Sequence, residues 1–364
     1  MRSMPHPHIR LSCAVSAGKV WALSASGGAP DGVELRHRGP PSYVRIMNID
    51  DHTLARAADT LRAWALDEDL KAKTLANPTA AALAAKVARR YTAGEEALAA
   101  VELLRVNAAR GHRGSIECVG ESVREASVAE REAEEFVNLA RRIGDVAENA
   151  TISFDLSHIG SVVSPQLGLR NALAIASAAR EAGTSIMISA EGSDRTDLVL
   201  DLYERIADGF PETGITLQAR LHRTPSDLDR VIGRPGPIRV VKGAFLEPES
   251  VAYPRDSEAM TAAYVEMATT LVRGDHRVHL ATHDPALVAR LRDELGDALR
   301  GDHVEFEMLQ GLGTELLDSL HQQGFATREY IVYGPEWWLY VLNRIAEHPE
   351  RVVQALADIG DPER

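Results

Sequence analysis

The chain has 364 residues and an ordinary globular composition, with 45% hydrophobic and 26% charged residues. Its formal net charge of −13 argues against nucleic-acid binding, which normally requires a basic patch. Two cysteines, Cys13 and Cys118, are too few for a disulfide framework or a cysteine-rich metal site, so a reducing cytoplasm is the simplest location. No run of about eighteen apolar residues is present, so no membrane-spanning helix is expected.

The first residues of the chain, 1–46, are rich in Gly, Pro, Ser and His and show no sustained period, which predicts a disordered tail. A basic beginning and a weakly apolar middle resemble a signal peptide, but Lys19 interrupts the apolar run. Met47 offers an alternative start, so it stays open whether residues 1–46 belong to the natural protein.

Residues 47–111 show a helical, alanine-rich pattern. The segments "DDHTLARAADTLRAWALDEDL" and "TAAALAAKVARRYTAGEEALAAVELLRVNAARG" place apolar residues at spacings of three and four, and both contain strong helix formers throughout. Because no strand comes before these helices, we expect them to form an N-terminal arm or cap on the domain that follows.

Residues 112–364 alternate between β-prone and helical segments. Eight β-prone runs begin near residues 115, 150, 184, 215, 238, 277, 303 and 328, each followed by a periodic segment. Strands alternating with helices indicate βαβ units, and eight of them favour an α/β fold of the TIM type, a (β/α)8 barrel, over an open sheet. No G-x-G-x-x-G motif follows any strand, so the usual dinucleotide-binding fingerprint is absent.

In such barrels the catalytic groups lie at the carboxyl ends of the strands. The polar residues expected there are Glu121, Asp155, His158, Ser189, Glu191, Gln218, Arg220, Arg239, Lys242, Thr282, His283, Asp284, Glu305, Glu307, Gln310, Tyr330 and Tyr333. Glu305 and Glu307 alternate with apolar residues, and about half of such glutamates are solvent-facing or paired with a helix cation. A metal site at Asp155 and His158 is not expected from two ligands. A Schiff-base role for Lys242 stays open.

The segment "YIVYGPEWWLYVLNRIAEHPE", from Tyr330, holds five of the chain's eighteen aromatic residues. Pro335 suits the first turn of a helix. On that helix an aromatic, an amide, a guanidinium and a carboxylate share one face, namely Tyr340, Asn343, Arg344 and Glu347. A guanidinium beside an aromatic wall suits a small carboxylate. The alternative, a solvated face with an Arg–Glu pair, stays open at this point.

Several segments together resemble the FAD-dependent proline dehydrogenase family. They are "VGES", "GITLQARLHRTPSDL", "IRVVKGAFLEPESVAYP", "LATHD", "VEFEMLQG" and the aromatic segment above, in order from about Gly114 to Pro349. The resemblance implies a distorted (β/α)8 barrel with a noncovalent FAD across its strand ends.

The resemblance also implies roles for individual residues. The residues that would bind the cofactor are Gln218, Arg239, Lys242, Gly243, Ala244, Thr282, His283 and Glu307. Those expected to bind the substrate are Ser189, Ala244, Leu309, Tyr330, Tyr340, Asn343, Arg344 and Glu347. The expected catalytic residues are Glu121, Asp155, Tyr330, Asn343 and Arg344, and no metal is expected. A cation beside the flavin stabilises the charge that arrives with hydride.

The substrate half departs from the family pattern. Paired arginines become Asn343 and Arg344, a lysine becomes Asp155 and an aspartate becomes Ser189. The pattern also differs at Phe245, Glu307 and Gln310. Even before Glu307 is counted, these changes make the site two charge units more negative, and losing one arm of a carboxylate clamp weakens carboxylate binding by a few kcal/mol. We therefore expect a flavoenzyme that oxidises a proline-like or other small amine to an imine, rather than free proline.

Two other functions stay open from the sequence. One is a barrel lyase or hydrolase that uses Lys242 or a metal, and the other is a catalytically silent FAD-binding relative. For the flavoenzyme, the electron acceptor is a quinone, oxygen or a partner protein, and a peripheral membrane contact is compatible with such an acceptor. The oligomeric state is not indicated.

Overall fold

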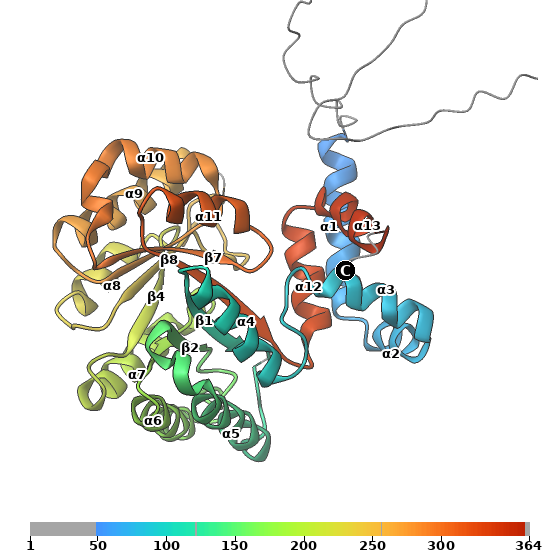
Figure 1. The fold of residues 1–364 in the computed structure, drawn as a ribbon, viewed down its shortest axis with the longest axis horizontal. Helices are drawn as coiled ribbons and strands as arrows, with labels where there is room; N and C mark the ends of the chain where they lie inside the picture. Colours follow the sequence, from blue (N-terminus) through green and yellow to red (C-terminus); the bar gives the residue numbers. More distant parts are fainter. Residues whose placement is uncertain (1–48, 121, 256, 361–364) are drawn as a thin grey trace, which may run out of the picture. The chain divides into compact units, whose positions relative to one another are not determined.

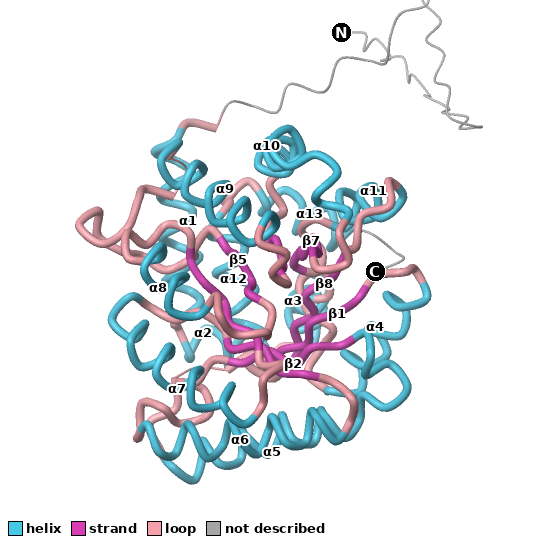
Figure 2. The backbone as a smooth tube through the Cα atoms, turned by 90° about the vertical axis from the view of Figure 1, so that its left-hand side faces the viewer, coloured by secondary structure: helices cyan, strands magenta, loops and turns pink. Residues whose placement is uncertain are grey.

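The computed structural model describes residues 49–120, 122–255 and 257–360. The predicted tail, residues 1–46, and the predicted catalytic residue Glu121 lie outside the described residues. Residues 50–364 form one unit. Figure 1 shows its elements in chain order, and Figure 2 shows helices surrounding a central ring of strands.

The eight predicted strands all form, and they close into a parallel barrel in chain order. Their bounds are β1 (Arg113–Cys118), β2 (Ala150–Phe154), β3 (Ser185–Ile188), β4 (Gly214–Gln218), β5 (Ile238–Val241), β6 (Val278–Ala281), β7 (Val304–Leu309) and β8 (Thr327–Tyr333). The ring closes where β1 pairs with β8, with Ser115 opposite Tyr330. The predicted (β/α)8 barrel is confirmed.

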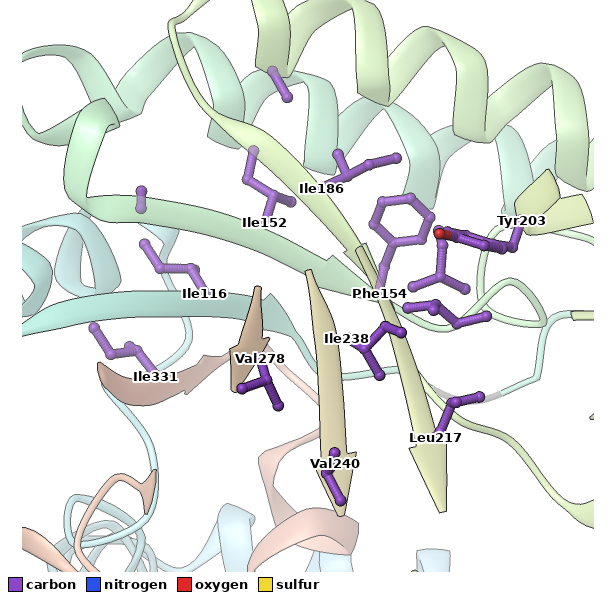
Figure 3. Packing of buried hydrophobic residues seen from close by; sticks show 14 of the residues in the cluster. Ile116, Ile152, Phe154, Ile186, Tyr203, Leu217, Ile238, Val240, Val278 and Ile331 are labelled. Carbon is purple, nitrogen blue, oxygen red and sulfur yellow. The ribbon is translucent and has the colours of Figure 1, made fainter. Parts of the chain in front are cut away.

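Helices cover the outside of the barrel. They are α4 (Ala97–Ala109), α5 (Ala126–Ile143), α6 (Pro165–Glu181), α7 (Thr196–Gly209), α8 (Thr224–Val231), α9 (Glu258–Arg273), α10 (Pro285–Leu295) and α11 (Thr314–Gln322), with short 3-10 turns at Gly144–Asn149, Ser193–Arg195 and Gly296–Arg300. The strands present apolar side chains to these helices, among them Ile152, Phe154 and Ile186 (Figure 3). A polar cap with proline at the first turn starts helices such as α10, where Asp284 accepts from the amides of Ala286 and Leu287.

A separate group of helices, the helical cluster, consists of α1 (Asp51–Ala65), α2 (Glu68–Ala76), α3 (Pro78–Ala88), α12 (Trp337–Glu347) and α13 (Arg351–Gly360). In Figure 1 the red C-terminal helices α12 and α13 lie beside the blue N-terminal ones, and the buried core of the cluster joins Leu61 and Tyr91 to Trp337 and Trp338. The two hydrophobic cores therefore do not follow the predicted boundary between residues 111 and 112. Helix α4 packs on the barrel, while α12 and α13 pack with the N-terminal helices.

The inside of the barrel is polar. Arg328 donates to Glu305 at 2.8 Å and to the backbone oxygen of Gly114 at 2.7 Å, and the side chains of Arg328 and Glu305 are both buried. Arg113 also donates to Glu305. The alternation on β7 was compatible with solvent-facing or helix-paired glutamates. Instead, Glu305 and Glu307 lie inside the barrel and pair with arginines of other strands. A closed barrel leaves its inward positions without solvent, so a charge there needs a partner.

Candidate active site

Arg239, on β5, lies at the centre of the barrel. Its Nε donates to Glu307 Oε2 at 2.7 Å, and its Nη2 donates to Glu307 Oε1 at 2.9 Å and to the hydroxyls of Ser115 and Ser153 at 3.0 and 3.1 Å. Burial alone would raise the pKa of Glu307, but Arg239 and His279 hold it well below its usual value. The guanidinium is thus held by a carboxylate that is ionised at neutral pH.

The predicted contact between Glu307 and a cofactor needs a correction. Both carboxylate oxygens are already bonded, Oε1 by Ser115 at 2.6 Å and by Arg239, and Oε2 by Arg239. The side chain is 1% exposed. Because its oxygens face Arg239 and Ser115, Glu307 positions Arg239 and does not present a free oxygen to a ligand.

Tyr330, on β8, covers Arg239. The Arg239 guanidinium carbon lies 4.8 Å from the centre of the Tyr330 ring, a cation–π contact. The Tyr330 hydroxyl donates to Glu117 Oε2, on β1. On the other side, Tyr330 lies opposite Leu309 of β7 in the strand register. Two predicted substrate residues, Tyr330 and Leu309, are therefore neighbours.

Glu117 is the site residue that the sequence reasoning missed. A signal for it exists, because Ser115 and Glu117 alternate with Ile116 and Cys118 on β1. Strand residues two apart share a face, and Ser115 bonds Arg239 inside the barrel, so Glu117 belongs to the same inward face. The polar residues of β1 should have been assigned to the barrel interior.

The carboxyl ends of β1 and β2 carry acidic groups with perturbed titration. Burial raises the pKa of Glu117 to about 7, although Arg239, His158 and Arg344 act to lower it. Burial and the repulsion of Glu117 and Glu191 raise the pKa of Asp155 well above its usual value. Predicted as a catalytic residue, Asp155 lies in this group beside Ser189. Two partly buried carboxyl groups that repel each other can hold a proton near neutral pH.

Gln218, at the end of β4, fits a ligand that donates a hydrogen bond. Its side chain is 4% exposed, and its Nε2 donates to the backbone oxygen of Glu191 at 2.8 Å. Its Oε1 is buried without a hydrogen-bond partner among the described residues. An unsatisfied buried acceptor costs stability, so a bound group with a ring N–H, such as the isoalloxazine of a flavin, suits this position.

Gly243 lies beside this acceptor, in a backbone conformation with φ +113°. A Cβ added there would lie 2.8 Å from Cγ and Cδ of Arg220 and 3.0 Å from Gln218 Oε1. Only glycine combines this φ with such close neighbours. The residues at the ends of β4 and β5 thus fit the predicted flavin.

Lys242 is partly engaged elsewhere. Its Nζ donates to Asp284 Oδ2 at 2.5 Å. The Lys242 ammonium group is therefore paired with Asp284 and is not free to act together with Gln218 and Arg239. Thr282 and His283 follow β6 on the same side, and burial, together with Arg351 and Arg344, lowers the pKa of His283 to about 4. His283 is therefore neutral at physiological pH.

The predicted polar face of α12 forms and is mostly buried. Arg344 Nη2 lies 2.7 Å from Glu347 Oε1, and the Arg344 guanidinium carbon lies 5.5 Å from the centre of the Tyr340 ring. Both charged side chains are only 20% exposed, so the alternative of a solvated face is wrong although its ion pair is present. Asn343 is half-buried beside them.

Two further details concern α12 and the loop after β5. Pro335 is not in the helix, which begins at Trp337 with Glu336 as its N-cap, so the predicted first-turn position is wrong by two residues. Arg344 has a buried Nε without a partner in the part of the chain that the structure describes. Ala244 lies exposed in the loop after β5, and its backbone oxygen accepts from Arg255.

Among the described residues, no three His, Cys, Asp or Glu side chains come together as a candidate metal centre. His158 Nε2 bonds Glu132 at 3.0 Å. None of the described helices is both long and apolar enough to span a bilayer.

Comparison with known proteins agrees with this geometry. The family model described as "Proline dehydrogenase" matches residues 100–346. Proline dehydrogenase 1 of Bacillus subtilis is 28% identical over 273 residues, covering 75% of this chain and 90% of the relative. Proline dehydrogenase of Deinococcus radiodurans is 29% identical over 279 residues, with 74% and 90% coverage.

Solved structures share the fold. Proline utilization A from Bdellovibrio bacteriovorus, inactivated by N-propargylglycine, superposes with a TM-score of 0.68 at 18% identity, covering 81% of this chain and 36% of that chain. The protein from Corynebacterium freiburgense gives a TM-score of 0.62 at 19% identity, with 86% and 35% coverage. This chain thus spans about a third of each of these much longer proteins. By its matched residues and its barrel, the chain belongs to the proline dehydrogenase family and is an enzyme of that flavin-dependent type.

Proposed function

We propose that this protein is an FAD-dependent dehydrogenase that takes hydride from the carbon next to an amine nitrogen and produces an imine. Its substrate is a proline-like or other small amine rather than free proline. The observation that carries this proposal is the state of the carboxylate clamp on α12. The helix has one arginine, Arg344, and its Nη2 lies 2.7 Å from Glu347.

The clamp is too weak for a free amino acid. A bidentate guanidinium matches the two oxygens of a carboxylate, and a second arginine doubles the charge available. Here the second position is Asn343, and Glu347 competes for Arg344. Losing one charged hydrogen bond costs about 1.5–3 kcal/mol of binding free energy. Arg344 Nε and Asn343 still offer donors to a neutral acceptor such as an amide oxygen.

The cofactor would be held at the ends of β4, β5 and β6. Gln218 would accept a hydrogen bond from the flavin ring, Gly243 would allow close approach, and Arg239 would face the ring as a fixed cation. The other residues that would contact FAD are Lys242, Ala244, Thr282 and His283. When bound, FAD accepts the hydride, and a nearby cation favours the charge that arrives with it.

The substrate would lie between β8 and α12. Tyr330, Leu309 and Tyr340 would enclose its apolar part, which excludes water from the reacting carbon. Asn343, Arg344 and Glu347 would orient its polar end. The remaining residues that we assign to substrate binding or catalysis are Ser189, Ala244, Asp155 and Glu121.

The returning electrons would pass to a quinone, to oxygen or to a partner protein. We place the protein in the cytoplasm, with a peripheral membrane contact compatible with a quinone acceptor. A lyase that uses Lys242 fits the geometry poorly, because an ammonium bonded to Asp284 is not a free nucleophile.

Anaerobic bleaching of the FAD-loaded protein tests the proposal. We would mix it with L-proline, prolinamide, pyrrolidine and N-methylpyrrolidine at equal millimolar concentrations and follow flavin absorbance. We expect at least one amine without a free carboxylate to bleach the flavin faster than L-proline. Rapid bleaching by L-proline alone would refute the changed substrate, and bound FAD with no bleaching over a broad amine panel would indicate a catalytically silent relative.

A further inference from the structure

We propose that Glu117 is the proton acceptor for a substrate that enters the site as an ammonium ion, with Tyr330 holding the carboxylate in position. This inference rests on the proposed function and names the charge state in which the amine is recognised. Glu117 lies next to the residues that would enclose the substrate ring and belongs to β1, a rigid element of the barrel.

Tyr330 holds Glu117 in position and is itself fixed by its neighbours. The Tyr330 hydroxyl donates to Glu117 Oε2, its ring lies 4.8 Å from the Arg239 guanidinium carbon, and its backbone is in register with Leu309. Tyr330 is the one described residue that hydrogen-bonds the Glu117 carboxylate, through Oε2. The other oxygen, Oε1, stays available to a ligand N–H in a half-buried site.

Charged and titratable groups act on Glu117 from several elements. They are Asp155 and His158 of the loop after β2, Arg239 of β5, Tyr330 of β8, and Tyr340 and Arg344 of α12. Burial favours the neutral acid, and the cations favour the carboxylate. The result is a pKa of about 7, close to the optimum for a general base working near neutral pH.

The proton step balances without any further reactant. One oxygen of ionised Glu117 takes the N–H proton of the ammonium substrate, which frees the nitrogen lone pair. The freed lone pair would then support formation of the C=N bond, for which FAD, if bound as proposed, would supply the hydride acceptor. Once Glu117 is ionised, its own negative charge favours an ammonium ion there over a neutral amine or an anion.

The test uses a matched pair of Tyr–Glu contacts on β8. Tyr330 bonds Glu117 inside the barrel, whereas Tyr333 lies 3.4 Å from Glu135 outside it. We would compare FAD-loaded wild type with Glu117→Gln and Glu135→Gln. Glu117→Asp keeps the acid and covers the case in which Glu117→Gln fails to fold.

The first readout does not depend on turnover. Infrared difference spectra of the oxidised protein between pH 6 and 9 should show the band of the protonated Glu117 carboxyl group, and pyrrolidinium chloride should move the loss of that band to lower pH, because an ammonium ion stabilises the carboxylate. We expect the band in wild type and in Glu135→Gln, at a shifted position in Glu117→Asp, and not in Glu117→Gln. No band in wild type, or an unchanged band in Glu117→Gln, overturns the proposal.

The second readout is the pH dependence of flavin bleaching in the same samples. At pH 7 we expect Glu117→Gln to be slower than wild type by roughly 10²- to 10⁴-fold. The deficit should shrink as pH approaches the pKa of the free amine, because the substrate then arrives neutral. A deficit that is the same at all pH values overturns the proposal. An infrared band without bleaching by any amine would instead refute the proposed function and leave the proton acceptor supported.

Discussion

The barrel interior has two polar layers that differ in how fully they are bonded. In the layer near the amino ends of the strands, Glu305 is bonded by Arg328 and Arg113, and Arg328 also bonds the backbone of Gly114. Toward the carboxyl ends, Gln218 of β4, and Arg344 of α12 beside them, each keep a buried polar atom without a partner in the described chain. The charged side chains Glu305, Arg328 and Arg113 are thus paired with one another, whereas Gln218 and Arg344 each have an atom left for a ligand.

The difference separates structural groups from ligand-binding groups. Buried charges that pair with each other fix strand register and need nothing more. Buried polar atoms without partners destabilise the folded protein until a ligand bonds them. Arg239 belongs to both sets, because it is paired with Glu307 and also lies against the Tyr330 ring. Removing groups from each layer should therefore change different properties.

The largest expected effect is the loss of a charge from the bonded layer. Arg328→Gln leaves Glu305 buried with its charge poorly compensated, which should lower the free energy of unfolding by about 3–5 kcal/mol. Urea unfolding measures this. Arg230→Gln is the control, because Arg230 pairs with Glu204 and Asp201 on the surface and its loss should cost less than about 1 kcal/mol. Equal losses in both variants would contradict the two-layer description.

Removing the charge of Glu117 at the mouth of the barrel should have the opposite effect and stabilise the folded protein. The pKa of Glu117 is raised from 4.5 to about 7, so the folded state holds a proton that the unfolded state releases between these pH values. Wild-type stability therefore falls as pH rises through this window. Glu117→Gln has no such fall and should be more stable than wild type above pH 7, by about 2–3 kcal/mol. Thermal melts from pH 4 to 8 check this, and parallel curves for the two proteins would contradict it.

Restoring the second arginine on α12 should increase the affinity for free L-proline. Asn343→Arg supplies a second guanidinium beside Arg344, which should strengthen binding of free L-proline by about 2 kcal/mol, a tenfold or larger fall in its KM. Asn343→Lys is the matched control, because it adds the charge without the planar fork. If neither variant changes the KM for L-proline, α12 does not bind the substrate carboxylate.

The smallest effect concerns the unbonded acceptor. Gln218→Leu removes Oε1 and the bond to Glu191, two changes of opposite sign, so stability should stay within about 1 kcal/mol of wild type. FAD affinity should fall about tenfold, the worth of one hydrogen bond. Isothermal titration of the apoprotein with FAD measures this, with Gln322→Leu on the exposed side of α11 as the control. A stability loss without a change in FAD affinity would assign Gln218 to the structure alone.

The sequence predicts the barrel well because its signals are local. Segments such as Ala150–Phe154 and Val304–Leu309 are short, β-prone and separated by periodic helices, so all eight strands could be found. The face of α12 could be found for the same reason, because Arg344 and Glu347 are three residues apart.

The missed features depend on contacts between distant residues. Glu305 pairs with Arg328 and Glu307 with Arg239, and no periodicity indicates which strand supplies the partner. The packing of α12 against α1 likewise joins the two ends of the described chain. Glu117 was within reach, since its alternation with Ile116 is local, but its significance depends on Tyr330 from the last strand.

The proposed function depends on FAD binding at the mouth of the barrel, beside Gly243 and Gln218. The most direct measurement is the absorption spectrum of the purified protein after incubation with FAD and removal of the excess. We expect close to one flavin per chain in wild type and in Gly209→Ala, where an added Cβ meets nothing within 4 Å. We expect little or none in Gly243→Ala, where it meets Arg220 and Gln218. A colourless wild-type protein, or equal flavin content in all three, would contradict the account.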